Sequence, residues 1–120
     1  MNRQDVLAFI QEEFDVTEER LWSNYPDYVV FRNKRNKKWF AIIMDVEKAR
    51  LGLEGSGKVD IINLKCDPLL IGSLRCNQGY LPAYHMSKKS WISVLLDGSV
   101  REDELKSLIC FSYELIEQAK

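Results

Sequence analysis

Residues Tyr80 to Asp97 read Tyr-Leu-Pro-Ala-Tyr-His-Met-Ser-Lys-Lys-Ser-Trp-Ile-Ser-Val-Leu-Leu-Asp, a polar loop followed by an apolar run of strand length. The loop carries the only histidine of the chain, two of its five tyrosines and a Lys-Lys pair. The apolar run, Trp91–Leu96, predicts a buried strand. Polar and aromatic chemistry is therefore expected on the surface loop that leads into this strand.

Three further strands are expected before this stretch. Tyr28–Arg32 and Lys37–Val46 flank a short turn and are typical of a β-hairpin, and Val59–Lys65 alternates as a third strand. Strict alternation would give the second hairpin strand two apolar faces, made of Trp39, Ala41 and Ile43 on one side and Phe40, Ile42, Met44 and Val46 on the other. A strand that is apolar on both faces favours a central position in the sheet.

Helices are expected at both ends of the chain and in its middle. Asn2 can cap the first helix, and the Asp67-Pro68 pair is typical of a helix start. Ser99 is expected to cap the last helix, with Glu102 completing a capping box. In the middle of that helix's apolar stripe lies Ser112, whose hydroxyl should bond the carbonyl one turn earlier or the loop near residue 80.

The elements follow the order α-β-β-β-α-β-α. Hairpins without regular βαβ alternation indicate an α+β fold, in which helices flank a mostly antiparallel sheet. With 120 residues, no internal repeat and no linker, the chain is expected to form a single domain over residues 1–120.

Composition narrows the classes of function. A formal net charge of -1 gives no global attraction to polyanions, so nucleic-acid binding would need a local basic patch. No apolar run has the roughly 20 residues of a membrane span, and the first residues lack the pattern of a secretory signal. Three cysteines, an odd number, suit reduced thiols. We therefore expect a cytoplasmic protein that has no membrane partner.

The turn of the predicted hairpin is strongly basic. Five of the seventeen Lys and Arg residues lie within seven positions: Arg32, Lys34, Arg35, Lys37 and Lys38. Such a turn could lie along a phosphate backbone as a wing and displace counterions there. The pair Lys88 and Lys89 would extend this surface if the fold brings it to the same side. The alternative is a solvated turn whose lysines protect a sheet edge from aggregation.

The loop before Trp91 is the second candidate site. His85 could act as an acid-base group or contact a ligand together with Tyr84, Trp91 and Lys65. A general acid or base needs a partner within hydrogen-bond reach, and no residue is spaced to be one. We therefore favour a loop-organising role for these four residues over a catalytic one.

Metal chemistry is not expected. The candidate ligands lack the short spacing of structural metal sites; they are Cys66, Cys76, His85 and Cys110. Cys66 precedes a helix start, which favours thiolates, but the adjacent Asp67 carboxylate opposes this, so Cys66 is expected to be buried packing. No catalytic residue, metal or cofactor is predicted.

Several segments, spread in order over most of the chain, resemble the MmcQ/YjbR family: Lys38–Ala41, Leu51–Gly55, Val59–Pro68, Ala83–Gly98 and Leu108–Leu115. The run Leu-Lys-Cys-Asp-Pro and the pattern Tyr-His-Met-x-Lys-x-x-Trp are the most specific pieces. The resemblance implies a bacterial cytosolic protein with a fold similar to that of secretion chaperones. It also implies the double-wing DNA-binding role that has been suggested for the family.

The function predicted from the sequence is therefore non-enzymatic. DNA binding through the basic hairpin comes first. A protein- or peptide-binding module that uses the sheet and the aromatic loop is the alternative, by analogy with secretion chaperones. A small-molecule or enzymatic role of the His85 loop comes third. The sequence predicts neither the oligomeric state nor the physiological partner.

Overall fold

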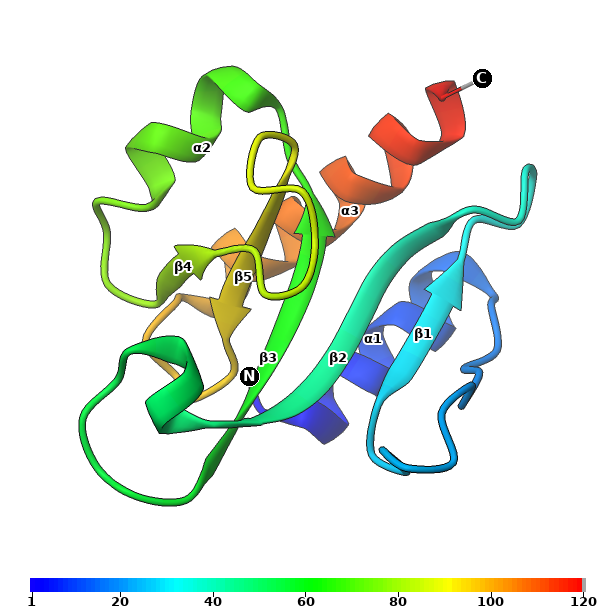
Figure 1. Ribbon diagram of the computed structural model, residues 1–120. Coiled ribbons are helices and arrows are strands. Elements are labelled where there is room, and N and C mark those ends of the chain that lie inside the picture. Colours follow the sequence, from blue (N-terminus) through cyan, green and yellow to red (C-terminus); the bar gives the residue numbers. More distant parts are fainter. Residues whose placement is uncertain (120) are drawn as a thin grey trace.

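Five antiparallel strands form one sheet in the order β1-β2-β3-β5-β4 (Figure 1). The computed structural model describes residues 1–119. The strands are β1 (Val29–Arg32), β2 (Trp39–Glu47), β3 (Lys58–Lys65), β4 (Tyr80–Pro82) and β5 (Trp91–Leu95). The predicted hairpin is β1 and β2, and both β2 and β3 lie in the interior of the sheet. The predicted α+β class is confirmed.

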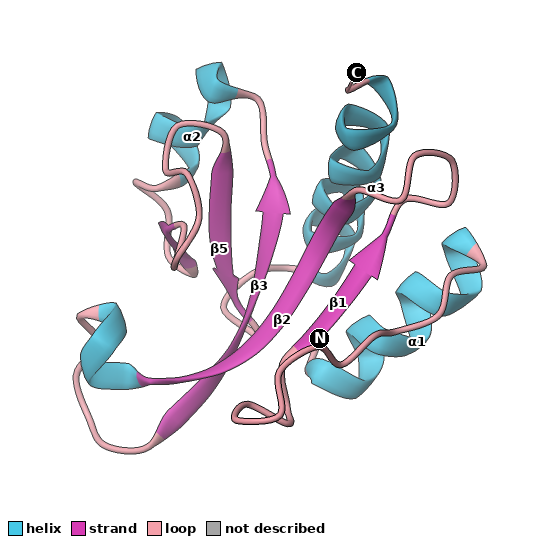
Figure 2. Cartoon of the chain, turned by 45° about the vertical axis from the view of Figure 1, so that its right-hand side comes forward, coloured by secondary structure: helices cyan, strands magenta, loops and turns pink. Residues whose placement is uncertain are grey.

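The helices are α1 (Arg3–Phe14), η1 (Lys48–Leu51, a 3-10 turn), α2 (Pro68–Leu74) and α3 (Glu102–Gln118). Helices α1 and α3 cover one face of the sheet, whereas η1 and the loop before β5 lie on the other face (Figures 1 and 2). The apolar core fills the space between the sheet and the two helices, for example around Ile10, Ile43 and Ile109, which are all fully buried. Neither α1 nor α3 covers the second face.

Two of the predicted helix caps are confirmed and one is wrong. Asn2 forms a capping box with Asp5 at the start of α1, and the Asp67 side chain accepts a hydrogen bond from the backbone of α2. Arg101, not Ser99, is the N-cap of α3, and its side chain makes no capping bond. The reason is local: Ser99 donates both its amide and its hydroxyl to the Asp97 carboxylate, which closes the preceding turn.

Strand β4 was not predicted, because residues 80–82 were assigned to the loop. They pair with β5 through the register Tyr80 opposite Val94. A three-residue segment that ends in proline gives no strand signal in a sequence, and proline is tolerated here because the strand is at the sheet edge.

A β-bulge interrupts the alternation of β2. Phe31 pairs with Ala41 and Arg32 pairs with Trp39, so Phe40 is an extra residue opposite β1. Phe40 packs against the rings of Phe14 and Tyr113 on the helical face. The prediction that Phe40 shares a face with Ile42 and Met44 is therefore wrong, and so is the grouping of Trp39 with Ala41. A bulge reorients side chains in this way because it adds one residue to only one strand.

Ser112 of α3 forms hydrogen bonds with two backbone groups of the sheet at this bulge. Its hydroxyl donates to the carbonyl of Phe40 at 2.7 Å and accepts the amide of Lys65 at 2.9 Å. These two backbone groups lie next to the end of the regular β2-β3 ladder, which starts with Ala41 opposite Leu64. The predicted bond to the preceding turn of the helix is thus wrong, because the buried hydroxyl satisfies a donor and an acceptor of the sheet.

Candidate ligand-binding site

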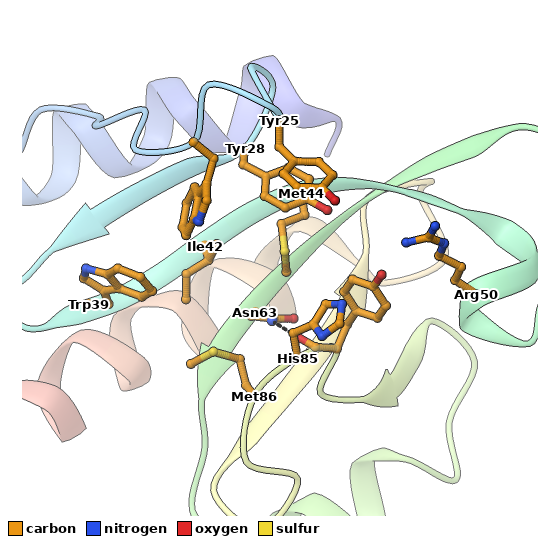
Figure 3. Close-up of a pocket in the computed structure, with 11 residues that line it drawn as sticks. Tyr25, Tyr28, Trp39, Ile42, Met44, Arg50, Asn63, His85 and Met86 are labelled. Atoms are coloured by element: carbon orange, nitrogen blue, oxygen red, sulfur yellow. Dashed lines mark hydrogen bonds between the residues drawn. The ribbon is translucent and has the colours of Figure 1, made fainter.

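A pocket of about 250 Å³ opens on the face of the sheet opposite to α1 and α3 (Figure 3). It is mainly aromatic and apolar. The residues that line it are Trp22, Tyr25, Tyr28, Trp39, Ile42, Met44, Arg50, Asn63, Tyr84, His85 and Met86. A concave, largely apolar cavity with a few polar groups is the usual form of a small-molecule site.

The floor of the pocket comes from the sheet. Ile42 of β2 lies opposite Asn63 of β3, so the two side chains are on the same face. Met44 follows two residues after Ile42 along the strand and lines the same cavity. Because these side chains belong to interior strands, the floor has a fixed shape.

The Tyr84–His85 segment is fixed to this floor through a closed set of hydrogen bonds. The backbone amide of Tyr84 donates to the Ser93 hydroxyl at 2.9 Å, and this hydroxyl donates to the Asn63 side-chain oxygen. The Asn63 amide donates back to the carbonyl of Tyr84 at 2.8 Å. Asn63 and Ser93 are both fully buried. Both backbone groups of Tyr84 are thus held by side chains of the sheet, which makes this wall of the pocket rigid.

His85 adopts an unusual backbone conformation directly after this anchor. Its φ angle is 58°, in the left-handed region that non-glycine residues visit infrequently, and its ring lies 4.0 Å from that of Tyr84. Such conformations persist when the surroundings over-determine them, and they are enriched at ligand sites. In this conformation the His85 side chain lines the pocket, although the residue itself is exposed.

The opposite wall is a cluster of aromatic rings. Trp22 makes edge contacts with Tyr28 and Trp39, with ring centres 5.8 and 5.7 Å apart, and Tyr25 stacks on Tyr28 at 4.6 Å. Figure 3 shows Tyr25 and Tyr28 entering from the segment before β1, while His85 and Met86 enter from the opposite side. The bulge at residue 40 allows Trp39 to join this wall. The rings support one another, so the wall exists before any ligand binds.

Arg50, from η1, is the cation of the pocket. Its side chain is exposed, and its interaction with the Tyr84 side chain raises the pKa of its guanidinium. A second hollow shares Arg50, Tyr84 and His85 with the pocket and also contains Lys88. Arg50 therefore belongs to both hollows, and the second hollow adds the cation Lys88.

The residues predicted for the loop site separate into two groups. Tyr84 and His85 line the pocket. Lys65 and Trp91 instead form a cross-strand pair of β3 and β5, with the ammonium 5.7 Å from the ring centre. Neither of them is among the residues that line the pocket.

The basic hairpin is partly neutralised. Arg32 forms an ion pair with Glu19, and Lys34 forms one with Asp15, both at 2.7 Å. Arg35 and Lys37 are exposed; Lys38 is exposed as well but takes part in an interaction of its own.

The hairpin turn is also anchored to α3. The side chains of Asn33 and Asn36 donate to the carbonyls of Tyr113 and Ile116 near the end of this helix, at 3.2 and 2.7 Å. Lys88 and Lys89 belong to the loop before β5, which is two strands away from β2; this loop lies apart from the hairpin turn in both views (Figures 1 and 2).

Most of the residues that line the pocket were not predicted from the sequence as site residues. Trp22 and Tyr25 follow no periodic pattern in the sequence; Tyr25 is 48% exposed and belongs to the aromatic wall. Neither Arg50 nor Asn63 belongs to a sequence motif that would indicate a binding site. A polar residue in the middle of the apolar strand Val59–Lys65 is the one signal that could have indicated Asn63, since buried amides need partners.

Neither a metal centre nor a membrane span is found in the described part of the chain. Across residues 1–119 no three side chains of His, Cys, Asp or Glu gather in a way that could hold a metal ion. The helices of the same residues are too short or too polar for a membrane crossing.

Fold and site together define a class: an α+β domain whose antiparallel sheet has helices on one face and an aromatic pocket on the other. The model of the YjbR family matches residues 13–115. The Bacillus subtilis (strain 168) protein named "Uncharacterized protein YyaQ" is 39% identical over 115 residues, which are 96% of this chain and 98% of YyaQ. This chain belongs to the YjbR family, as the sequence motifs predicted.

Solved structures agree with this assignment. A crystal structure of a Pseudomonas syringae protein has a TM-score of 0.94 and 44% identity, with 97% of this chain and 99% of that chain covered. A solution NMR structure from the same organism has a TM-score of 0.88 and 43% identity, with 100% and 98% covered. Deinococcus radiodurans protein DR2400, with a DUF419 domain, shares the fold at a TM-score of 0.74 and 24% identity, with 98% and 79% covered.

Proposed function

We propose that this protein is a non-catalytic binding module that holds an aromatic group in the pocket beside Tyr84 and His85. The observation that carries the proposal is the anchoring of Tyr84 by Asn63 and Ser93, which uses two fully buried polar side chains to fix a surface loop. Buried polar networks are costly unless every group is satisfied, and here every group has a partner. A fixed loop that faces a preformed aromatic wall is pre-organised for a ligand.

The size and lining of the pocket select the kind of ligand. A volume of about 250 Å³ suits one small ring system better than an extended peptide. Flat aromatic rings favour stacked or edge contacts, which the rings of Trp22, Tyr28 and Trp39 offer. We do not propose a catalytic reaction. His85 has a ring contact with Tyr84 but no hydrogen-bond partner among the described residues that would make it a general base.

The three tryptophans provide the test. Trp22 and Trp39 line the pocket and Trp91 does not. In a titration with small naphthalene derivatives followed by NMR, the indole N–H signals of Trp22 and Trp39 should shift together, while that of Trp91 stays in place. Equal shifts of all three signals, or none at any soluble concentration, would contradict the proposal.

DNA binding through the hairpin is the second proposal, supported by the exposure of Arg35 and Lys37. Affinity for a short duplex should then fall with salt, with a log-log slope of about -0.9 for each phosphate contacted. Arg35→Glu should weaken this binding more than Arg75→Glu, which makes the same charge change at an exposed position after α2. Equal effects of the two substitutions would reject a hairpin wing.

A further inference from the structure

The lining of the pocket contains a cation but no carboxylate. Among the described residues that line the pocket and the hollow beside it there is no carboxylate, whereas Arg50 belongs to both and Lys88 to one. Asp45 and Glu47 line a third hollow, which shares Arg50 and Tyr84 with the pocket; there Asp45 pairs with Lys58 at 3.4 Å. An aromatic cage built for a cation would be expected to carry acids in place of these cations.

Arg50 is also available to a ligand. Within residues 1–119 its guanidinium forms no ion pair with a carboxylate, and Tyr84 is the side chain with which it interacts most strongly. A guanidinium has five N–H donors in a fixed plane, so donors remain for an acceptor on a ligand. Figure 3 shows Arg50 at one end of the cavity, beyond the apolar side chains of Ile42 and Met44.

We propose that the ligand is a small aromatic carboxylate, with its ring against Trp22, Trp39 and Tyr28 and its carboxylate bound by Arg50. This inference rests on the proposed function and narrows it to one chemical class. A carboxylate matches the guanidinium in a planar, two-bond geometry, and Arg50 is the one side chain with a permanent charge among those that line the main pocket. Because Arg50 supplies a single permanent positive charge, the pocket favours a ligand with a single negative charge.

Three probes with the same ring system and different charge test this inference: 2-naphthoate, its neutral analogue 2-naphthamide, and the cation 2-naphthylmethylammonium. Each is titrated into the full chain, and the indole N–H signals of Trp22 and Trp39 report binding, with Trp91 as the internal reference. The naphthoate should bind on the order of tenfold more tightly than the amide, because its bond to Arg50 is charge-assisted. The cation should bind most weakly.

Arg50→Gln provides the decisive variant. Arg50 is exposed, so the fold should tolerate this change, and Arg75→Gln is the matched control at another exposed arginine. In Arg50→Gln the naphthoate should lose about tenfold in affinity and become equal to the amide, whose own affinity stays the same. In Arg75→Gln the tenfold preference should persist.

The outcomes separate the two proposals. If no probe shifts Trp22 and Trp39, the pocket function fails, and this inference fails with it. If the amide or the cation binds as tightly as the naphthoate, the pocket function stands and the carboxylate assignment is wrong. The assignment is also wrong if Arg50→Gln weakens the acid and the amide equally.

Discussion

The side-chain amide of Asn63, in the centre of β3, donates a hydrogen bond of 2.8 Å to the backbone carbonyl of Tyr84, twenty-one positions further along the chain. The Ser93 hydroxyl accepts a hydrogen bond from the backbone amide of Tyr84. Side chains of the sheet therefore satisfy both backbone hydrogen-bonding groups of Tyr84, as a neighbouring strand would, although the residue lies in a loop. This relationship links the stability of the interior to the shape of the pocket.

Ser93→Ala should loosen this anchor. The change leaves the amide of Tyr84 and the side-chain oxygen of Asn63 without their hydrogen-bond partner, which should cost about 1–3 kcal/mol of unfolding free energy. Chemical denaturation measures the loss, and hydrogen exchange of the Tyr84 amide should become faster. Ser56→Ala, at an exposed loop serine, is the control and should change neither. Unchanged exchange at Tyr84 would show that the loop is held by other contacts.

Ser112→Ala should destabilise the protein through the bulge. Its hydroxyl bonds the Phe40 carbonyl and the Lys65 amide, so the alanine leaves two backbone groups unsatisfied, at a cost of about 2–4 kcal/mol. Urea unfolding of this variant can be compared with Ser107→Ala on the exposed side of the same helix, for which we expect a change within about 0.5 kcal/mol. Similar stabilities of the two variants would mean that the hydroxyl contributes little.

The ion pair of Asp15 and Lys34 should give a measurable pH signature. The hydrogen bond and charge of Lys34 lower the pKa of the Asp15 carboxyl, and the same interaction raises the pKa of the Lys34 ammonium. Because the folded pKa of Asp15 is below its unfolded value, the stabilisation is complete above the unfolded pKa. It is lost as the pH falls through the folded one.

For Lys34 the sign is reversed: its contribution is present below the unfolded pKa and is lost as the pH rises through the folded value. Both groups are fully exposed, so the effect on overall stability should be small. NMR titration of the Asp15 carboxyl carbon should show its pKa rising toward the ordinary value in Lys34→Met. In Lys37→Met it should stay lowered. An identical titration in both variants would contradict the pairing.

The cysteines should differ in reactivity. Burial, with a smaller effect of the Asp67 charge, raises the pKa of the Cys66 thiol, and Cys66 is 2% exposed, whereas Cys76 is exposed. The thiolate is the reactive form, so a maleimide at pH 8 should modify Cys76 first and Cys66 only after unfolding. Mass spectrometry of the labelled peptides gives the order. Fast labelling of Cys66 in the native protein would place it at the surface and restore it as a candidate nucleophile.

Local signals in the sequence predicted much of the fold. The Asn2 and Asp67 caps and the alternation of Val59–Lys65 depend on residues close together in the chain, and each located its element. Errors arose where a partner far away in sequence decides the outcome. The predicted alternation in β2 is wrong because Phe40 is an extra residue between the pairs Arg32–Trp39 and Phe31–Ala41. The bond predicted for Ser112 within its own helix is wrong because its partners lie in β2 and β3, far away in the sequence.

The candidate site was predictable only in part. Tyr84 and His85 were predicted as candidate site residues because they belong to a polar, aromatic loop. Both line the pocket. Trp22, Trp39 and Arg50 come from three separate segments, and no spacing in the chain relates them. Sequence proximity grouped Trp91 with His85, but a strand that runs away from its loop places the indole against Lys65 instead.

The extra residue at position 40 has a consequence for how this protein could diversify. Because Trp39 belongs to the pocket and Phe40 to the helical core, removing one residue at this point would move neighbouring side chains to the opposite face of the sheet without substituting any of them. A change of binding preference could therefore arise from a one-codon deletion or insertion in the hairpin. Comparisons of relatives should count residues between β1 and β2 as carefully as they compare identities.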